Sequence, residues 1–520
     1  MADNLLEKAS ILLTPTAYND GSMLSVKPEN GDGDFTFSRG SAATRVNAQG
    51  LVENVQILSS ELVTNGDFAI DSDWNKGTGW SIANGKAVAN TTGNFVNLYQ
   101  NSVFVVGKTY KTTFTIVDYT QGKVRLTEGG VNVSGYQNAV GTYTTYFTAS
   151  QTALYMQGSE SFIGSITNIS VKEITDDTDL PRIDYTDGCG SWLLEPQSTN
   201  LVTYSEDFSQ SSWLKIASGS GVSPSITSNY AISPDGTQNA SRVILDAGTA
   251  SPSSLSMVRT NVSGLSNPHN SSISFYVKSN TLDNYKILVY NESLNPIEVI
   301  ANNSWQRIEL STTVSLSSDR IHLGLWDFGG ILTDSYADVS IWGAQLEEQS
   351  YATSYIPTNG SIATRLADVA NNSGNSTLIN STEGVLYAEI AALADDSNER
   401  YFGASDGTTS NRISLWYYSA TNGLAVAVYS GGVAQFFTTT ILSNDIDYNK
   451  VAIKYKENDF ALWVNGTEVS TDTSGSVPIG LNRLSFDRAS GANNFYGKTK
   501  ALAVYKEALT DAQLQSLTTI

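Results

Sequence analysis

Apolar residues along this chain recur at every second position, in short runs separated by Gly, Asn, Asp and Ser. The runs at 110–117 (YKTTFTIV), 273–277 (ISFYV) and 451–455 (VAIKY) are rich in β-branched and aromatic side chains. Alternation with period two is typical of strands with one buried face. Helical periodicity is nearly absent from the rest of the chain. The pattern therefore predicts an all-β protein made of antiparallel sheets.

Two local signals near the C-terminus are specific enough to place individual residues. The run at 460–464 (FALWV) alternates between two faces and ends in Asn465-Gly466, a pair suited to the positive φ angles of a type I′ hairpin turn. Thr510 and Gln513 have the spacing of a capping box before Leu514 and Leu517. We expect a tight hairpin at 465–466 and a helix beginning after Thr510.

An internal repeat divides the middle of the chain. Residues 62–68 (LVTNGDF), followed by Trp74, match residues 201–208 (LVTYSEDF), followed by Trp213. The copies span about 110 and 140 residues, the size of one jelly-roll sandwich each. Because the two tryptophans occupy equivalent positions in diverged copies, we expect them to pack in a core or at its edge.

Shorter segments between the modules are also alike. Residues 40–46 (GSAATRV) resemble residues 360–366 (GSIATRL), and each lies near the edge of a module. The predicted organisation is an N-terminal anchor or connector segment, a jelly roll, a connector, a second jelly roll, a connector and a third sandwich, at residues 1–60, 61–176, 177–200, 201–350, 351–380 and 381–520.

Composition and charge exclude several classes of function. Lys and Arg total 30 against 51 Asp and Glu, giving a net charge of −21, so nucleic-acid binding is disfavoured. One cysteine excludes a disulfide framework, and two histidines leave almost nothing for a zinc site. No apolar stretch is long enough to span a membrane.

The two repeated modules resemble carbohydrate-binding modules of the galactose-binding-like jelly-roll type. The stretch from about 384 to 518 resembles a concanavalin A-like (laminin-G-like) lectin sandwich, and the connectors resemble those of bacteriophage structural proteins. The first likeness is carried by residues 62–68, 79–87, 105–116 and 304–310, the second by 450–466 and 495–514, and the third by 35–55, 195–208 and 342–365.

These resemblances imply a bacteriophage virion protein, a fibre or surface-decoration subunit on the capsid or tail. The N-terminal region would contact other virion proteins, the chain would form a homo-oligomer (a trimer by analogy with phage fibres), and the outer sandwiches would bind host-surface glycan. One alternative is an architectural cement protein without sugar binding. Another is a virion-borne polysaccharide depolymerase, but the Glu-x-Asp-x-x-Glu strand common in glucanases of the lectin fold is missing, so we expect no enzyme.

Sugar binding by a sandwich needs an aromatic ring exposed on a sheet face. In the strand at 412–418 the alternation places Arg412, Trp416 and Tyr418 on one face. In the strand at 321–328 it places His322 and Trp326 on one face, together with Phe328. The alternative for both sets is a packing role, under a loop or a partner subunit.

Asp67 is the natural carboxylate for a structural calcium ion, which jelly rolls of the resembled type often hold near the first strand. Ala69 follows in place of a second acid, and neither copy has a dense run of acidic ligands. The sequence implies no other cofactor.

Overall fold

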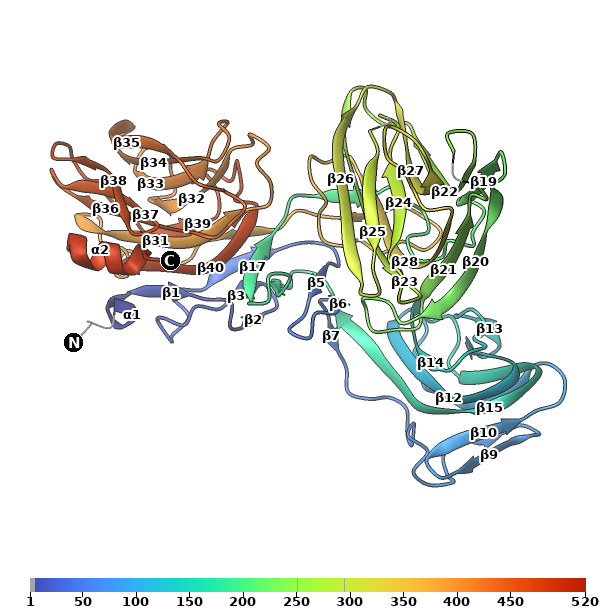
Figure 1. Cartoon of the computed structure of the whole chain (residues 1–520). Helices are drawn as coiled ribbons and strands as arrows, with labels where there is room; N and C mark the ends of the chain where they lie inside the picture. The colour runs from blue at the N-terminus through green and yellow to red at the C-terminus, as the bar shows by residue number, and fades with distance from the viewer. Residues whose placement is uncertain (1–4, 250, 294) are drawn as a thin grey trace.

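Antiparallel strands contain 52% of the residues and helices only 2%, which confirms the predicted all-β class. The structure, a computed structural model, describes residues 5–249, 251–293 and 295–520. Figure 1 shows three lobes joined by the N-terminal segment and the connectors. No helix in the described part of the chain is long and apolar enough to span a membrane.

The first lobe is a sandwich in which two long strands run through both layers. The shifts in register along the ladder between β12 (Thr109–Glu128) and β15 (Leu154–Asp176) mark where both strands bend. One half of this pair binds β14 and β10, and the other half binds β13 and β11. The remaining strands are β7 (Ile57–Leu58), β8 (Asn75–Lys76), β9 (Trp80–Ala83), β10 (Lys86–Asn90), β11 (Val96–Gln100), β13 (Val131–Asn132) and β14 (Gly141–Thr148).

The second lobe consists of two five-stranded sheets. The first has the order β19 (Leu214–Ser218), β22 (Leu255–Ser263), β27 (Ser318–Trp326), β24 (Tyr285–Tyr290), β25 (Ile297–Ala301). The second has the order β20 (Val222–Ala231), β21 (Ala240–Asp246), β28 (Tyr336–Glu347), β23 (His269–Ser279), β26 (Gln306–Val314). Alternate residues of both sheets fill one apolar core between them.

The repeated tryptophans have the same packing role in both lobes. Trp74 donates its indole N–H to the carbonyl of Asn65 at 3.0 Å, and Trp213 donates to the carbonyl of Tyr204 at 2.8 Å. Each ring is buried and lies against the phenylalanine of its own copy, Phe68 or Phe208. The predicted packing role of both tryptophans is confirmed.

The C-terminal lobe packs an eight-stranded sheet against a five-stranded sheet. The larger sheet contains β16 (Ile183–Asp184), β17 (Ser191–Leu194), β40 (Gly497–Tyr505), β31 (Glu383–Ala392), β36 (Asn449–Lys456), β37 (Phe460–Val464) and β38 (Thr467–Asp472), with β1 (Ile11–Leu13) also on β40. The smaller sheet contains β35 (Val433–Ile441), β34 (Gly423–Ser430), β33 (Arg412–Tyr417), β32 (Arg400–Ser405) and β39 (Arg483–Ser485).

Both local predictions near the C-terminus are confirmed. Asn465 and Gly466 have φ angles of 49° and 82° between β37 and β38, as a type I′ turn requires. The helix α2 (Asp511–Thr518) begins with the capping box of Thr510 and Gln513, and Leu514 is buried beneath it against Trp463.

The N-terminal segment, predicted as a connector, runs along the C-terminal lobe and contributes to its core (Figure 1). Ile11 and Leu13 of β1, and Phe35 and Phe37 of β4 (Phe35–Ser38), are buried in the same cluster as the strands after residue 381. The boundary predicted at residue 381 therefore omits strands that complete this sandwich. The segment also contains α1 (Leu5–Lys8), β2 (Tyr18–Asn19), β3 (Ser22–Met23), β5 (Thr44–Val46), β6 (Val52–Asn54), and the connectors contain β18 (Ser198–Asn200), β29 (Ala363–Arg365) and β30 (Val369–Asn371).

Candidate functional site

The outward face of the β19–β25 sheet in the second lobe carries a cluster of aromatic residues, which we call the platform: Tyr290, Trp326 and Phe328. Ile321, Leu323 and Leu325 point into the core, so residues 322, 324 and 326 of β27 point outward, as the alternation predicts. Met257 of β22 and Leu288 of β24 lie beneath the platform and are buried on this outward face.

The platform rings are held in a defined arrangement. Trp326 and Phe328 are stacked, with ring centroids 4.1 Å apart and planes 7° apart. The indole N–H of Trp326 donates to the carbonyl of Pro252 at 2.9 Å, which fixes the ring on the sheet. Trp326 and Phe328 are only half-buried, so both rings keep accessible surface. Exposed ring surface of this kind is what a pyranose C–H face stacks on.

Gly324 keeps the centre of this face flat. A Cβ built on Gly324 would lie 2.3 Å from the Cβ of Met257 on the neighbouring strand. No other residue fits there without moving β22, and the position lies between His322 and Trp326 on the same face. The absent side chain lets Met257 and Leu288 approach closely and support the rings above them.

His322 lies in the floor of this face and is uncharged. Its ring stacks on Tyr290 at 4.1 Å and its Nδ1 lies 3.2 Å from the sulfur of Met257. Burial, together with the nearby charges of Arg320 and Arg259, lowers the pKa of His322 to about 3. Its Nε2 is buried and has no hydrogen-bond partner among the described residues. His322 therefore packs under the platform while its Nε2 stays unused.

The outward face of the β35–β39 sheet in the C-terminal lobe places the other candidates differently. Trp416 is only 8% exposed, because Tyr401 stacks on it at 4.8 Å and Phe437 lies 6.1 Å away, also stacked. Phe437 is 58% exposed and is the accessible ring of this row. Trp416 points outward as predicted, but neighbouring rings pack against it.

Arg412 and Tyr418 lie on the same outward face and are held by local contacts. The Arg412 guanidinium lies 3.8 Å from the ring centroid of Tyr429, and its Nε donates to the hydroxyl of Ser414 at 3.1 Å. Arg412 is buried and Tyr418 is half-buried. The structure therefore brings Arg412, Trp416 and Tyr418 together, in a packed rather than an open arrangement.

Asp67, the calcium candidate, is exposed in the turn after residue 65 and accepts a hydrogen bond from the Ala69 amide at 3.4 Å. Within the described ranges, no group of three or more His, Cys, Asp or Glu side chains has the geometry to hold a metal ion. A calcium role for Asp67 stays a prediction.

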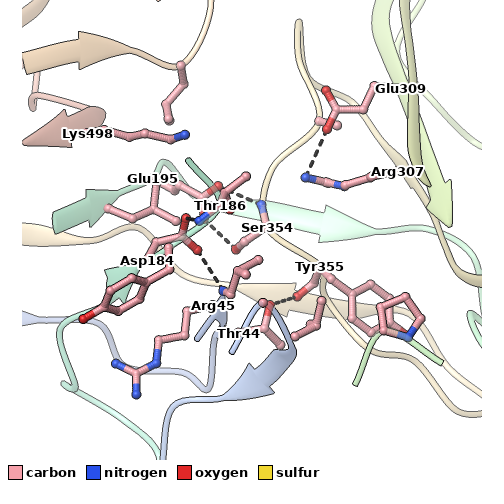
Figure 2. A pocket seen from close by; sticks show the side chains of 18 of the residues that line it. Thr44, Arg45, Asp184, Thr186, Glu195, Arg307, Glu309, Ser354, Tyr355 and Lys498 are labelled. Carbon is pink, nitrogen blue, oxygen red and sulfur yellow. Dashed lines mark hydrogen bonds and ion pairs between the residues drawn. The ribbon is translucent and has the colours of Figure 1, made fainter. Parts of the chain in front are cut away.

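A pocket of about 550 Å³ lies where the N-terminal segment, the connectors, the second lobe and the C-terminal lobe meet (Figure 2). Its charged lining residues are largely paired: Arg307 with Glu309 at 3.0 Å, and Lys498 with Asp187, outside the lining, at 2.7 Å. Asp184 accepts hydrogen bonds from the amides of Val46 and Thr186. These contacts use the polar groups to join segments, so we assign no ligand to this pocket.

Beside the pocket, buried ion pairs link three connectors, and we call this cluster the hub. Arg182 pairs with both Glu195 and Asp368, Arg365 pairs with Glu195 at 2.9 Å, and Arg39 pairs with Asp368 at 3.0 Å. All five side chains are almost fully buried. The two arginines hold the pKa of Glu195 well below its usual range despite the burial that opposes this. The connector segments singled out in the sequence thus meet in one structural cluster.

Sequence reasoning missed three residues of the second-lobe face: Tyr290, Met257 and Arg259. Tyr290 ends the alternating run at 286–290 (KILVY), which has the pattern of a strand, but nothing in the sequence pairs that strand with β27. In the structure Tyr290 and Arg259 are the register partners of His322 on either side. The missing information was strand order, which the alternation of one strand does not contain.

The C-terminal lobe is concanavalin A-like: the family model of the concanavalin A-like lectin/glucanases superfamily matches residues 371–515. No curated protein matches the chain. Similar solved structures include a Ruminococcus gnavus sialidase CBM40 bound to sialyllactose (18% identity, 28% of this chain and 86% of that chain, TM-score 0.25). Another is a tandem CBM22 domain of Paenibacillus barcinonensis Xyn10C (11% identity, 57% of this chain and 98% of that chain, TM-score 0.21). A third is mouse laminin α1 domains LG4-5 (11% identity, 51% of this chain and 94% of that chain, TM-score 0.18). At such low identities and TM-scores these likenesses carry no weight for function.

Proposed function

We propose that this chain is a glycan-binding structural protein of a bacteriophage virion, a fibre or surface-decoration subunit. The observation that carries the glycan part is the stacked, half-exposed pair of Trp326 and Phe328 on the outward face of the second lobe. Aromatic rings fixed on a sheet face offer stacking area at little cost in side-chain entropy, because the packing beneath has already ordered them.

The virion part of the proposal is supported by the resemblance of the connectors to those of phage structural proteins. In this proposal the chain assembles as a trimer on the capsid or tail, contacts other virion proteins, and presents its sandwiches to the host surface. Each site binds weakly, at roughly millimolar strength, and many copies give firm attachment by avidity. Immunogold labelling is expected to place the chain on the capsid or tail of the particle. The mass of the purified protein in solution is expected to be that of three chains.

The glycan part is tested with the full chain on a glycan array. Trp326→Ala is expected to abolish binding to every glycan that the wild-type chain binds on the array. Trp305→Ala is the matched control, because Trp305 is also half-buried in the second lobe and donates its indole N–H to a backbone carbonyl, that of Ile232, at 2.9 Å. Equal binding by both variants would refute the assignment of the platform.

The second candidate function is purely architectural, and the hub favours it. A buried cluster that ties three connectors together serves a protein whose task is to hold fixed positions. In that case the wild-type chain binds no glycan on the array. Trp326→Ala lowers the yield of assembled particles, and the adsorption of each intact particle to host cells is unchanged.

A further inference from the structure

Arg259, next to the platform, is a cation without a partner. It lies on β22 on the outward face, as the register partner of His322 on β27 and of Leu214 on β19. Among the described residues its guanidinium has no ion pair, hydrogen bond or ring contact, and its Nε is buried. Arg259 is half-buried, and leaving its buried Nε without an acceptor costs free energy. None of the described residues supplies an acidic partner for it.

The other charges on this face cancel in pairs. Arg320 pairs with Glu292, and Lys286 lies 3.8 Å from Glu298. His322 is buried and uncharged near neutral pH, so it adds no charge, but its buried Nε2 is also unpartnered beside Arg259. Among the described residues, Arg259 is therefore the cation of this face that has no acid beside it, in a protein of net charge −21.

The overall negative charge does not prevent an anion from binding here. At physiological salt the Debye length is about 8 Å, so distant carboxylates are largely screened from an anion that binds at Arg259. A guanidinium fork matches a carboxylate with two parallel hydrogen bonds, which are stronger than those between neutral groups.

We propose, resting on the glycan-binding function above, that the second lobe recognises a sugar that carries a carboxylate, of the uronic-acid class. Trp326 and Phe328 stack on one sugar ring of an oligosaccharide, and Arg259, four residues further along the sheet by register, receives the carboxylate of a neighbouring sugar. The ligand supplies the acid that Arg259 lacks among the described residues.

The experiment measures binding of the full chain to oligogalacturonides and to the same oligosaccharides fully methyl-esterified. The wild type is expected to bind the acid form about tenfold more tightly, with an affinity that falls as salt is raised. Arg259→Gln is expected to remove this preference for the acid form, whereas Arg259→Lys, which keeps the charge, retains part of it. Arg125→Gln in the first lobe is the matched control: Arg125 also has no carboxylate partner in the described part of the chain, and its guanidinium contacts Gln157 and Tyr136 instead.

The possible outcomes separate the two proposals. If the wild type binds neither form, nor any other glycan, the platform is not a sugar site and the proposed function fails. If acid and ester bind equally, or Arg259→Gln keeps the preference, the glycan function stands and the carboxylate assignment is overturned. Unchanged thermal unfolding of Arg259→Gln shows that the loss is not misfolding.

Discussion

Truncating Phe35 to alanine should destabilise the C-terminal lobe strongly, although Phe35 precedes β31 by more than 300 residues in the sequence. Its side chain is 0% exposed and its ring lies 5.0 Å from that of Phe486. Phe486 in turn contacts Phe402 and Phe495 at 5.1 and 5.7 Å. Phe35 is therefore one side of an aromatic cluster at the centre of this core.

The expected cost follows from burial and cavity formation. Phe→Ala at a fully buried site typically costs about 3–5 kcal/mol, because the transfer free energy is lost and the cavity closes only in part. Domains are commonly stable by only about 5–15 kcal/mol, so this single change removes a large share. Phe437→Ala is the matched control in the same lobe: Phe437 is 58% exposed, and we expect a loss below about 1 kcal/mol.

Hydrogen exchange is the suitable assay, because it reports each lobe separately, and proteins of several domains commonly do not unfold as one unit. Amides of β31 and β36, which pair at the centre of the large sheet, are expected to exchange roughly a hundredfold faster or more in Phe35→Ala. Amides of β12 in the first lobe should not change. If only the N-terminal segment lost protection while β31 and β36 kept theirs, the segment would be peripheral and the reasoning refuted.

Two further predictions concern buried charge at the junction. Arg182→Met leaves Glu195 and Asp368 buried with fewer cations, and is expected to cost roughly 3–5 kcal/mol, seen as faster hydrogen exchange in the connectors. Burial and the nearby Asp235 raise the pKa of Glu206 from 4.5 to about 7. Since the folded state binds this proton more tightly than the unfolded state, the stability contribution is full below pH 4.5 and is lost as pH rises to 7, by up to ~3 kcal/mol. Glu206→Gln should flatten this part of the pH profile in urea unfolding, and an unchanged slope between pH 4.5 and 7 would contradict the assignment.

Local patterns in the sequence were sufficient to predict the features that depend on residues close together in the chain. The alternation at 460–464, the Asn465-Gly466 turn and the Thr510 capping box each depend on interactions within a few residues, and each is found as predicted. The repeat also predicted the packing of Trp74, because the same local motif is built twice. None of these needed knowledge of which strands lie side by side.

The sites depend on strand order, which local patterns do not specify. Alternation correctly placed Trp416 and Trp326 on outward faces, but whether a ring is open depends on its neighbours across the sheet. Tyr401 and Phe437, on strands β32 and β35, cover Trp416, whereas Trp326 keeps accessible surface. The two GS-x-ATR segments likewise diverge: Arg365 is buried in the hub, while the equivalent Arg45 pairs with Glu53 nearer the surface.

The hub links this architecture to binding. Buried ion pairs contribute little net stability compared with apolar packing, but each charge needs its partner present at the same time. Arg182 reaches its two carboxylates only when the connectors containing Glu195 and Asp368 are both in place. That requirement fixes how the connectors between the lobes run. A weak site on a fixed scaffold gains more from multivalency than one on a flexible tether, because less freedom is lost when the second copy binds. The buried charges of the hub thus hold in place the connectors on either side of the second lobe, which carries the aromatic face.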